Sequence, residues 1–211
     1  MSTEQGVLYV VATPLGNLGD FSARAQETLA GVALIAAEDT RHSARLLRHF
    51  SITTPLIALH EHNERERSAD LIARLQSGAA LALISDAGTP LISDPGYTLV
   101  QAAHAARIRV CPVPGPSALI AALSASGLPS DRFAFEGFLP PRAAARRTQL
   151  AAVQHEQRTL IFYEAPHRLL ASLNDMCSVF GATRAAVLAR EITKLFETIR
   201  HDSLQGLCDF V

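Results

Sequence analysis

The sequence predicts an α/β protein built mainly on a parallel sheet. Short apolar segments of strand-like composition alternate with helical segments over roughly the first 120 residues. Parallel strands require crossover connections of this kind, and the resulting helices cover both faces of the sheet. Apolar residues make up 48% of the 211-residue chain, which is enough for a sizeable core and excludes a disordered chain.

Five segments of this first part are predicted strands, because each is a short apolar run bounded by turn residues. They span residues 7–12, 32–37, 56–59, 80–84 and 108–113. The first helix is expected to have Asp20 as its N-cap and Phe21, Ala25 and Leu29 on its apolar face. The other helices are predicted over residues 43–49, 64–76 and 97–106, followed by an alanine-rich helix that ends near 125.

The character of the sequence changes around residues 127–131, and we expect two domains, 1–120 and 121–211. In the second domain the predicted elements are strands at 159–163 and 185–189 and a helix over 167–180 between them. An aromatic-rich segment, 133–138, precedes a segment of basic residues, 139–147, that is expected to be an exposed loop.

Charge and composition narrow the function. The formal net charge of −1 argues against a protein that holds nucleic acid by bulk charge, although local basic patches are not excluded. The three widely spaced cysteines, Cys111, Cys177 and Cys208, fit neither a disulfide framework nor a zinc site. No apolar run approaches the roughly 20 residues of a membrane-spanning helix, and no secretory signal is visible. We therefore expect a cytoplasmic protein without a metal.

The loops that follow the strands are the expected ligand sites, because open α/β sheets bind ligands at the carboxyl ends of their strands. The strongest signal is 85–96, in which two Asp, two Gly and two Pro follow a buried strand. The loop 13–20 is rich in glycine but matches neither the Walker nor the GxGxxG pattern, so a plain turn is an equal alternative. The loop 114–117 has the same character and ends at Ser117.

The segment after the second strand carries charged residues. Glu38 and Asp39 stand where a dinucleotide-binding protein keeps its ribose carboxylate, although a helix N-cap explains them equally well. Arg41, Arg45 and Arg48 then recur on one helical face, which indicates either a solvated surface or a phosphate-binding one.

Seven segments, taken together, resemble one known family. They are TPLGNLGD (13–20), AAEDTRHS (36–43), SDAGTPLISDPG (85–96), VPGPSA (113–118), GLPSDRFAFEGFLP (127–140), FYEAPHR (162–168) and LAREITK (188–194). The chain is similar over essentially its whole length to the ribosomal small-subunit methyltransferase I family. These are 16S rRNA cytidine-2′-O-methyltransferases of the tetrapyrrole methylase superfamily. The segment 85–96 is the most specific of the seven.

The resemblance implies two α/β domains of the tetrapyrrole methylase type, with S-adenosylmethionine between them, and a homodimer. The implied substrate is a cytidine of 16S rRNA in the decoding region of the small ribosomal subunit. The implied cofactor contacts are Pro14, Leu15, Asp86, Gly88, Thr89, Ser117 and Ala118, and from the second domain Phe162, Tyr163, Leu188 and Ala189. Family members continue beyond the last residue of this sequence, so the second domain, 121–211, is expected to be incomplete relative to the family.

Removal of the proton from a ribose hydroxyl calls for a general base. The candidates are Glu38, Asp39, His42, Glu164 and His167. We favour Glu38 and Asp39, with Arg41 orienting a substrate phosphate. The residues expected to hold RNA are Arg45, Arg48, Arg142, Arg146 and Arg147.

Three other functions remain open at this stage. One is methylation of a porphyrin or corrin precursor, although TPLGNLGD and SDAGTP differ from the glycine-rich and GDP-type motifs of that branch. Another is a ribosome-binding fragment without activity. The third is a nucleotide-binding enzyme that uses Glu38 or Asp39 on a ribose.

Overall fold

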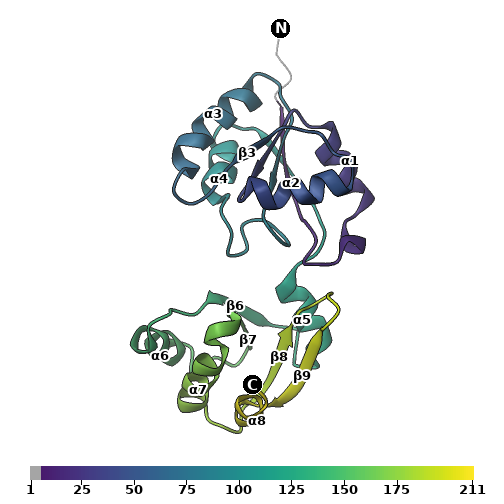
Figure 1. Ribbon diagram of the computed structural model, residues 1–211. Helices are drawn as coiled ribbons and strands as arrows, with labels where there is room; N and C mark the ends of the chain where they lie inside the picture. The colour runs from purple at the N-terminus through teal and green to yellow at the C-terminus, as the bar shows by residue number, and fades with distance from the viewer. Residues whose placement is uncertain (1–5) are drawn as a thin grey trace. The chain divides into compact units, whose positions relative to one another are not determined.

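The computed structural model describes residues 6–211. The chain divides into two compact units, the first ending at Ser117 and the second spanning Ala118–Val211 (Figure 1). The two units are described separately below. Within the described residues, no helix combines the length and the apolar character that a membrane crossing demands.

The first unit is built on a five-stranded parallel sheet, which confirms the predicted fold class. The strands are β1 (Val7–Val11), β2 (Leu34–Ala37), β3 (Leu56–Ala58), β4 (Leu81–Ile84) and β5 (Arg109–Val113). They lie in the order β3-β2-β4-β1-β5. From β1 the chain crosses to β2, toward the β3 edge of the sheet. From β4 it crosses to β5, at the opposite edge. The strand order therefore reverses between β1 and β4, and such a switch point is where α/β sheets bind ligands.

Two helices cover each face of this sheet. The four helices are α1 (Ala23–Gly31), α2 (Thr40–His49), α3 (Glu64–Gln76) and α4 (Tyr97–Ala105). Leu29 of α1 and Leu47 of α2 pack with Ile84, whereas Leu75 of α3 and Leu99 of α4 pack with Leu83. Neighbouring residues of a strand point to opposite faces, so the continuously apolar β4 supplies both cores.

The start of α1 differs from the prediction. Asp20 lies in a short 3-10 turn, η1 (Leu18–Asp20), and the N-cap is Ser22, whose Oγ accepts a hydrogen bond from the Ala25 amide at 3.1 Å. Phe21 is buried as expected but precedes the helix. Both Asp and Ser are good N-caps, and the extra turn places Ser22 at the helix start.

The second unit contains two small sheets and four helices. Its elements are α5 (Ala118–Ser126), β6 (Phe133–Phe138), α6 (Ala143–Ala152), β7 (Thr159–Tyr163), η2 (Pro166–Arg168), α7 (Leu169–Phe180), β8 (Ala185–Arg190), β9 (Thr198–Ser203) and α8 (Leu204–Phe210). Strands β6 and β7 are parallel, and β8 and β9 form an antiparallel hairpin. A core of Leu173, Leu188, Leu204 and Leu207 joins the hairpin to α7 and α8.

The prediction of an exposed basic loop at 139–147 is wrong. Helix α6 begins at Ala143, and Leu139 and Arg146 are 1% and 4% exposed. The burial of Arg146 requires a partner for its charge, and α7 supplies that partner, as described below.

Candidate active site

The loops after β1 and β4 are joined by backbone hydrogen bonds at the switch point of the first unit. The Thr13 amide donates to the Gly88 carbonyl at 2.8 Å, and the Gly88 amide donates back to the Thr13 carbonyl at 3.0 Å. The buried Thr13 hydroxyl also donates to the Ser85 carbonyl at 3.1 Å. The loop 85–96, which carries the strongest ligand signal in the sequence, is therefore hydrogen-bonded to the loop 13–20 next to the buried Pro14.

Gly88 brings three of these loops close together. Its φ of +86° lies in the left-handed region, and a Cβ at this position would lie 3.1 Å from Leu15 Cδ2 and 3.6 Å from the Pro116 carbonyl oxygen. The hydroxyl of Thr89 donates to that same carbonyl at 3.0 Å. The three loops thus meet at Gly88, which lies close to both Leu15 and Pro116. Any other residue at position 88 would be strained and would crowd this space.

The loop after β2 joins the same edge through Asp86. Its carboxylate oxygen Oδ1 accepts a hydrogen bond from the Asp39 amide at 3.1 Å. Burial raises the pKa of Glu38 above its ordinary value, and the nearby carboxylates of Asp94 and Asp86 raise it further. Burial also raises the pKa of Asp94. The structure therefore gathers three carboxyl groups beyond the ends of β2 and β4 and raises the pKa of two of them, Glu38 and Asp94.

Asp39 has a different environment from Glu38. Its carboxylate caps α2 by accepting hydrogen bonds from the amides of Arg41 at 2.8 Å and His42 at 3.4 Å. These bonds hold the pKa of Asp39 below its ordinary value. Arg41 Nε lies 3.6 Å from Asp39 Oδ1, while the Arg41 side chain is 91% exposed. Of the two neighbouring acids, Glu38 is thus the one whose environment suits proton exchange.

Glu64 anchors the far end of the loop 85–96, a role that the sequence did not indicate. Its Oε1 accepts hydrogen bonds from the amides of Gly96 at 3.0 Å, Thr98 at 2.7 Å and Leu99 at 3.4 Å. The side chain comes from the first turn of α3 and caps the first turn of α4. In the sequence Glu64 is one of several acidic residues on a polar helix. Its role as a cap becomes visible only in the structure, where α3 packs against α4.

In the second unit, Phe162 and Tyr163 form the end of β7. The Tyr163 hydroxyl accepts a hydrogen bond from the Leu119 amide at 3.2 Å, which places this side chain beside the first turn of α5, where Ala118 begins the helix. The Tyr163 ring lies with its centroid 4.8 Å from that of Phe135. Phe162 is half-buried. An aromatic surface therefore stands at the carboxyl end of this parallel pair.

Leu188 and Ala189 lie on β8, in the other sheet of this unit. The Leu188 side chain belongs to the core, with 9% of its surface exposed, and Ala189 is half-buried. Because its side chain is buried, Leu188 could contact a cofactor only through its backbone.

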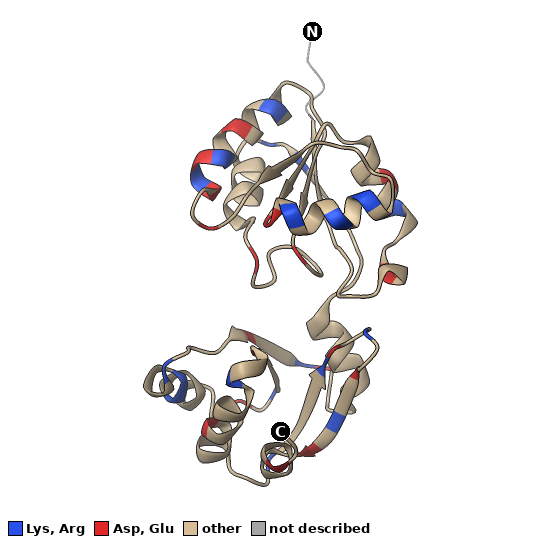
Figure 2. Cartoon of the chain, viewed as in Figure 1, with Lys and Arg blue, Asp and Glu red and all other residues tan. Residues whose placement is uncertain are grey.

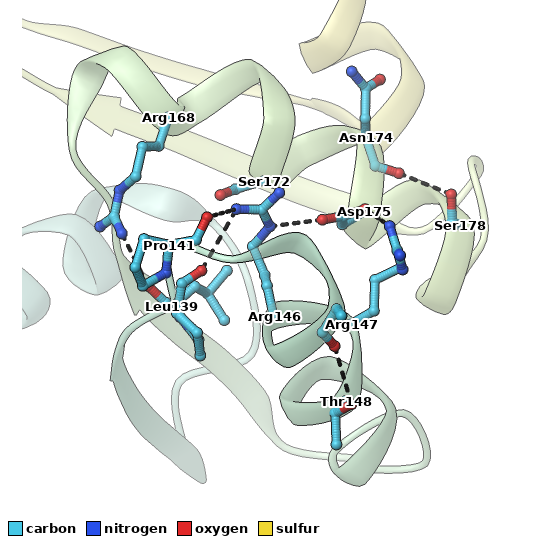
Figure 3. A network of polar contacts seen from close by, with 12 residues as sticks. Leu139, Pro141, Arg146, Arg147, Thr148, Arg168, Ser172, Asn174, Asp175 and Ser178 are labelled. Carbon is cyan, nitrogen blue, oxygen red and sulfur yellow. Dashed lines mark hydrogen bonds and ion pairs between the residues drawn. The ribbon is translucent and has the colours of Figure 1, made fainter.

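The basic patch predicted on the second unit is largely a structural ion pair (Figure 3). Arg146 Nε lies 2.6 Å from Asp175 Oδ2, and the Arg146 side chain is 5% exposed, which argues against the expected role of Arg146 in RNA binding. Arg147 Nη1 lies 3.3 Å from the other oxygen of Asp175, with 53% of the side chain exposed. Arg142 is exposed at the start of α6.

Glu164 is also a structural residue. It is 8% exposed in its side chain and lies 2.6 Å from Arg168 Nη2, and it accepts hydrogen bonds from the Ala165 amide and the Ser172 hydroxyl. Arg168 in turn donates to the Leu139 carbonyl at 3.2 Å (Figure 3). These contacts fix the start of α7 and occupy the carboxylate, which argues against Glu164 as a base.

In the described part of the chain, no group of three or more His, Cys, Asp or Glu side chains could hold a metal ion. The candidate chemistry of the first unit rests on carboxylates, backbone amides and glycine.

The fold and the ligand loops define a class of protein. The sequence pattern of the tetrapyrrole (corrin/porphyrin) methylases matches residues 7–208, and the chain belongs to this family of methyltransferases. Within it, the chain is a member of the ribosomal RNA small subunit methyltransferase I family. It is 68% identical over 98% of its length to the protein of that name from Pseudomonas aeruginosa, of which it covers 73%. It is 60% identical over 92% of its length to the same-named protein from Escherichia coli O157:H7, covering 68% of that protein.

Solved structures support the fold. A crystal structure of diphthine synthase matches with a TM-score of 0.71 at 17% identity, covering 96% of this chain and 84% of that one. A uroporphyrin-III-C-methyltransferase from Thermus thermophilus matches with a TM-score of 0.62 at 19% identity, covering 96% and 85%. At these identities the likeness concerns the fold alone.

Proposed function

We propose that this chain is an S-adenosylmethionine-dependent methyltransferase that acts on the ribose 2′-hydroxyl of a cytidine in 16S rRNA, in the decoding region of the small ribosomal subunit. The observation that carries the proposal is the 68% identity over 98% of the chain to a protein named ribosomal RNA small subunit methyltransferase I. We further propose that the chain is cytoplasmic and acts as a homodimer. Light scattering, which measures molar mass in solution, tests the dimer.

The loops of the first unit fit the methyl donor. Gly88 lets backbone approach a ligand where a Cβ would crowd Leu15, and the carboxylate of Asp86 suits a ribose hydroxyl or an ammonium group. S-adenosylmethionine supplies an electrophilic methyl group on a sulfonium centre. We assign its contacts to the loop residues Pro14, Leu15, Asp86, Gly88, Thr89 and Ser117, and to Ala118, Phe162, Tyr163, Leu188 and Ala189 of the second unit.

Glu38 is the proposed general base. A ribose hydroxyl is a poor nucleophile until its proton is removed, and a carboxylate with a raised pKa takes that proton more readily than an ordinary one. Asp39 holds the start of α2, and we assign the orientation of a substrate phosphate to Arg41, whose largely exposed side chain supports this role. Positioning of the hydroxyl in line with the methyl group supplies the remaining catalysis.

The reaction is tested with methyl-tritiated S-adenosylmethionine and small ribosomal subunits that lack the modification. After the reaction the RNA is hydrolysed in alkali, which requires a free 2′-hydroxyl at the cleaved linkage. Label in an alkali-resistant dinucleotide is the expected result. Label in mononucleotides would place the methyl group on a base, and no label despite cofactor binding would exclude this substrate and make porphyrin precursors the next acceptor to test.

The assignment of the base is tested by Glu38→Gln, with Asp39→Asn as the matched control. Loss of a general base lowers the rate about 10²–10⁴-fold, while cofactor affinity is retained. Asn is as good an N-cap as Asp, so Asp39→Asn is expected to lose less than about ten-fold. The wild-type rate should rise with pH through a pKa above that of an ordinary glutamate. Equal losses in both variants would contradict the assignment.

A further inference from the structure

The exposed face of α2 carries basic side chains and no acidic one. The exposed basic and histidine residues of α2 are Arg41, His42, Arg45, Arg48 and His49. Figure 2 shows no Asp or Glu along this helix. Among the described residues, Arg45 and Arg48 form no ion pair, since the one pair on α2 joins Arg41 to its cap. Arg45 and Arg48 therefore present their charges to solvent without an acidic residue on the same helix.

The other arginine-rich helices differ from α2. In α3 of the same unit, Arg65, Arg67 and Arg74 alternate with acids, a mixture of signs typical of a solvated surface. In α6 of the second unit, Arg146 and Arg147 share the carboxylate of Asp175. The structure thus separates the two basic patches that the sequence suggested: Arg146 and Arg147 are paired with Asp175, whereas Arg45 and Arg48 of α2 are exposed and form no ion pair among the described residues.

We propose that the face of α2 formed by Arg41, Arg45 and Arg48 binds the phosphates of the RNA strand that carries the target nucleotide. This inference rests on the function proposed above and names the surface by which the first unit holds its substrate. Guanidinium groups pair with phosphate oxygens in a bidentate geometry, and such contacts position an RNA strand without reading its bases.

The spacing of the three arginines suits a strand of RNA. From position 41 to 48 an α-helix rises about 10 Å. The face is therefore long enough for its guanidinium groups to contact successive phosphates of one strand. Beside Arg48, an open hollow of about 330 Å³ lies between α2 and the segment 51–56.

The direction of α2 connects this surface to the proposed base. The helix begins at its cap Asp39, directly after Glu38 at the end of β2. A strand of RNA held along the arginines therefore runs toward the carboxyl edge of the sheet, where Asp86 and Gly88 lie in the neighbouring loop. Binding on α2 and proton removal by Glu38 thus belong to one continuous surface of the first unit.

The test compares two double variants with equal changes of charge. Arg45→Gln/Arg48→Gln removes the proposed contacts, and Arg67→Gln/Arg74→Gln removes two exposed arginines of α3. Affinity for unmodified small ribosomal subunits is measured over a range of salt concentrations, and S-adenosylmethionine affinity is measured by calorimetry. The α2 variant is expected to bind subunits about ten-fold or more weakly and to lower the salt slope by about 1.4, at about 0.7 per phosphate contact. Cofactor affinity and the α3 variant should match the wild type.

Each other outcome has a defined meaning. Wild-type affinity and salt slope in the α2 variant would overturn the inference while leaving the proposed function intact. Equal weakening of both variants would show a diffuse effect of net charge and would also overturn it. A wild-type protein that binds the cofactor but no subunits would refute the proposed substrate, and with it the role of α2.

Discussion

Replacing Arg146 with methionine is expected to destabilise the second unit strongly. In the folded chain its Nε lies 2.6 Å from Asp175 Oδ2, and its Nη1 lies 3.4 Å from the Pro141 carbonyl oxygen. The Arg146 side chain is 5% exposed and that of Asp175 11%. Methionine is close to the buried stem in shape and carries no charge, so Arg146→Met removes the ion pair while keeping most of the packing.

The expected cost follows from the burial of the pair. Removing one partner of a buried ion pair costs about 3–5 kcal/mol, because the other charge is left without compensation. Here Arg147 remains 3.3 Å from Asp175, which keeps the cost near the lower end, about 3 kcal/mol. For a domain of about 100 residues, 1 kcal/mol lowers the midpoint of thermal unfolding by about 4 °C or more, so the shift should exceed about 12 °C.

Arg147→Met is the matched control, because it removes the same charge from the same carboxylate at a half-exposed position. Its expected cost is about 1 kcal/mol or less. Thermal unfolding is followed together with hydrogen exchange of α6 and α7, with the first unit as an internal reference. Equal stability of the two variants would refute the structural role. A loss of RNA affinity by Arg146→Met at unchanged stability would instead restore the role that the sequence suggested.

Three further substitutions or reactions test local features. Glu64→Gln keeps the shape of the cap on α4 but removes its charge, and should cost about 1 kcal/mol in urea unfolding, because the two shortest of its hydrogen bonds, at 2.7 and 3.0 Å, are charge-assisted. Tyr163→Phe leaves the Leu119 amide without its partner and should cost about 1 kcal/mol, with faster exchange of that amide. Burial and the neighbouring thiol raise the pKa of Cys208 to about 11, so its alkylation rate should increase about ten-fold per pH unit from 8 to 10, followed by mass spectrometry. A rate that levels off near pH 9 would contradict this environment.

Local patterns predicted most elements of the first unit. The helix expected over 64–76 is α3, Glu64–Gln76, because its apolar residues recur with helical spacing before a glycine. The position of the ligand loops followed in the same way, since every parallel strand places its carboxyl end at one edge of the sheet. Neither inference requires knowledge of which strands are neighbours.

Features that depend on distant partners were not predictable. Arg146 is read from sequence as part of a basic, exposed segment, and its burial depends on Asp175, which reaches it only through the packing of α7 on α6. Likewise, Glu38 and Asp39 are equivalent in sequence. They differ in the structure because Glu38 is partly buried and lies near Asp94 and Asp86 of the loop after the neighbouring strand β4, while Asp39 turns into the start of α2.

The proximity of a basic helix to an acidic cluster has a consequence for catalysis. A carboxylate beside a polyanion has its pKa raised, because each nearby phosphate disfavours the charged form. Glu38 already has a raised pKa from burial and from Asp94 and Asp86, and RNA phosphates without counterions would raise that pKa further and so disfavour the form that accepts a proton. Arginines paired with those phosphates limit that rise. At saturating RNA, Arg45→Gln/Arg48→Gln should therefore shift the acid limb of the pH–rate profile to higher pH. An unshifted limb would show that the two arginines contribute to RNA binding but do not affect the pKa of Glu38.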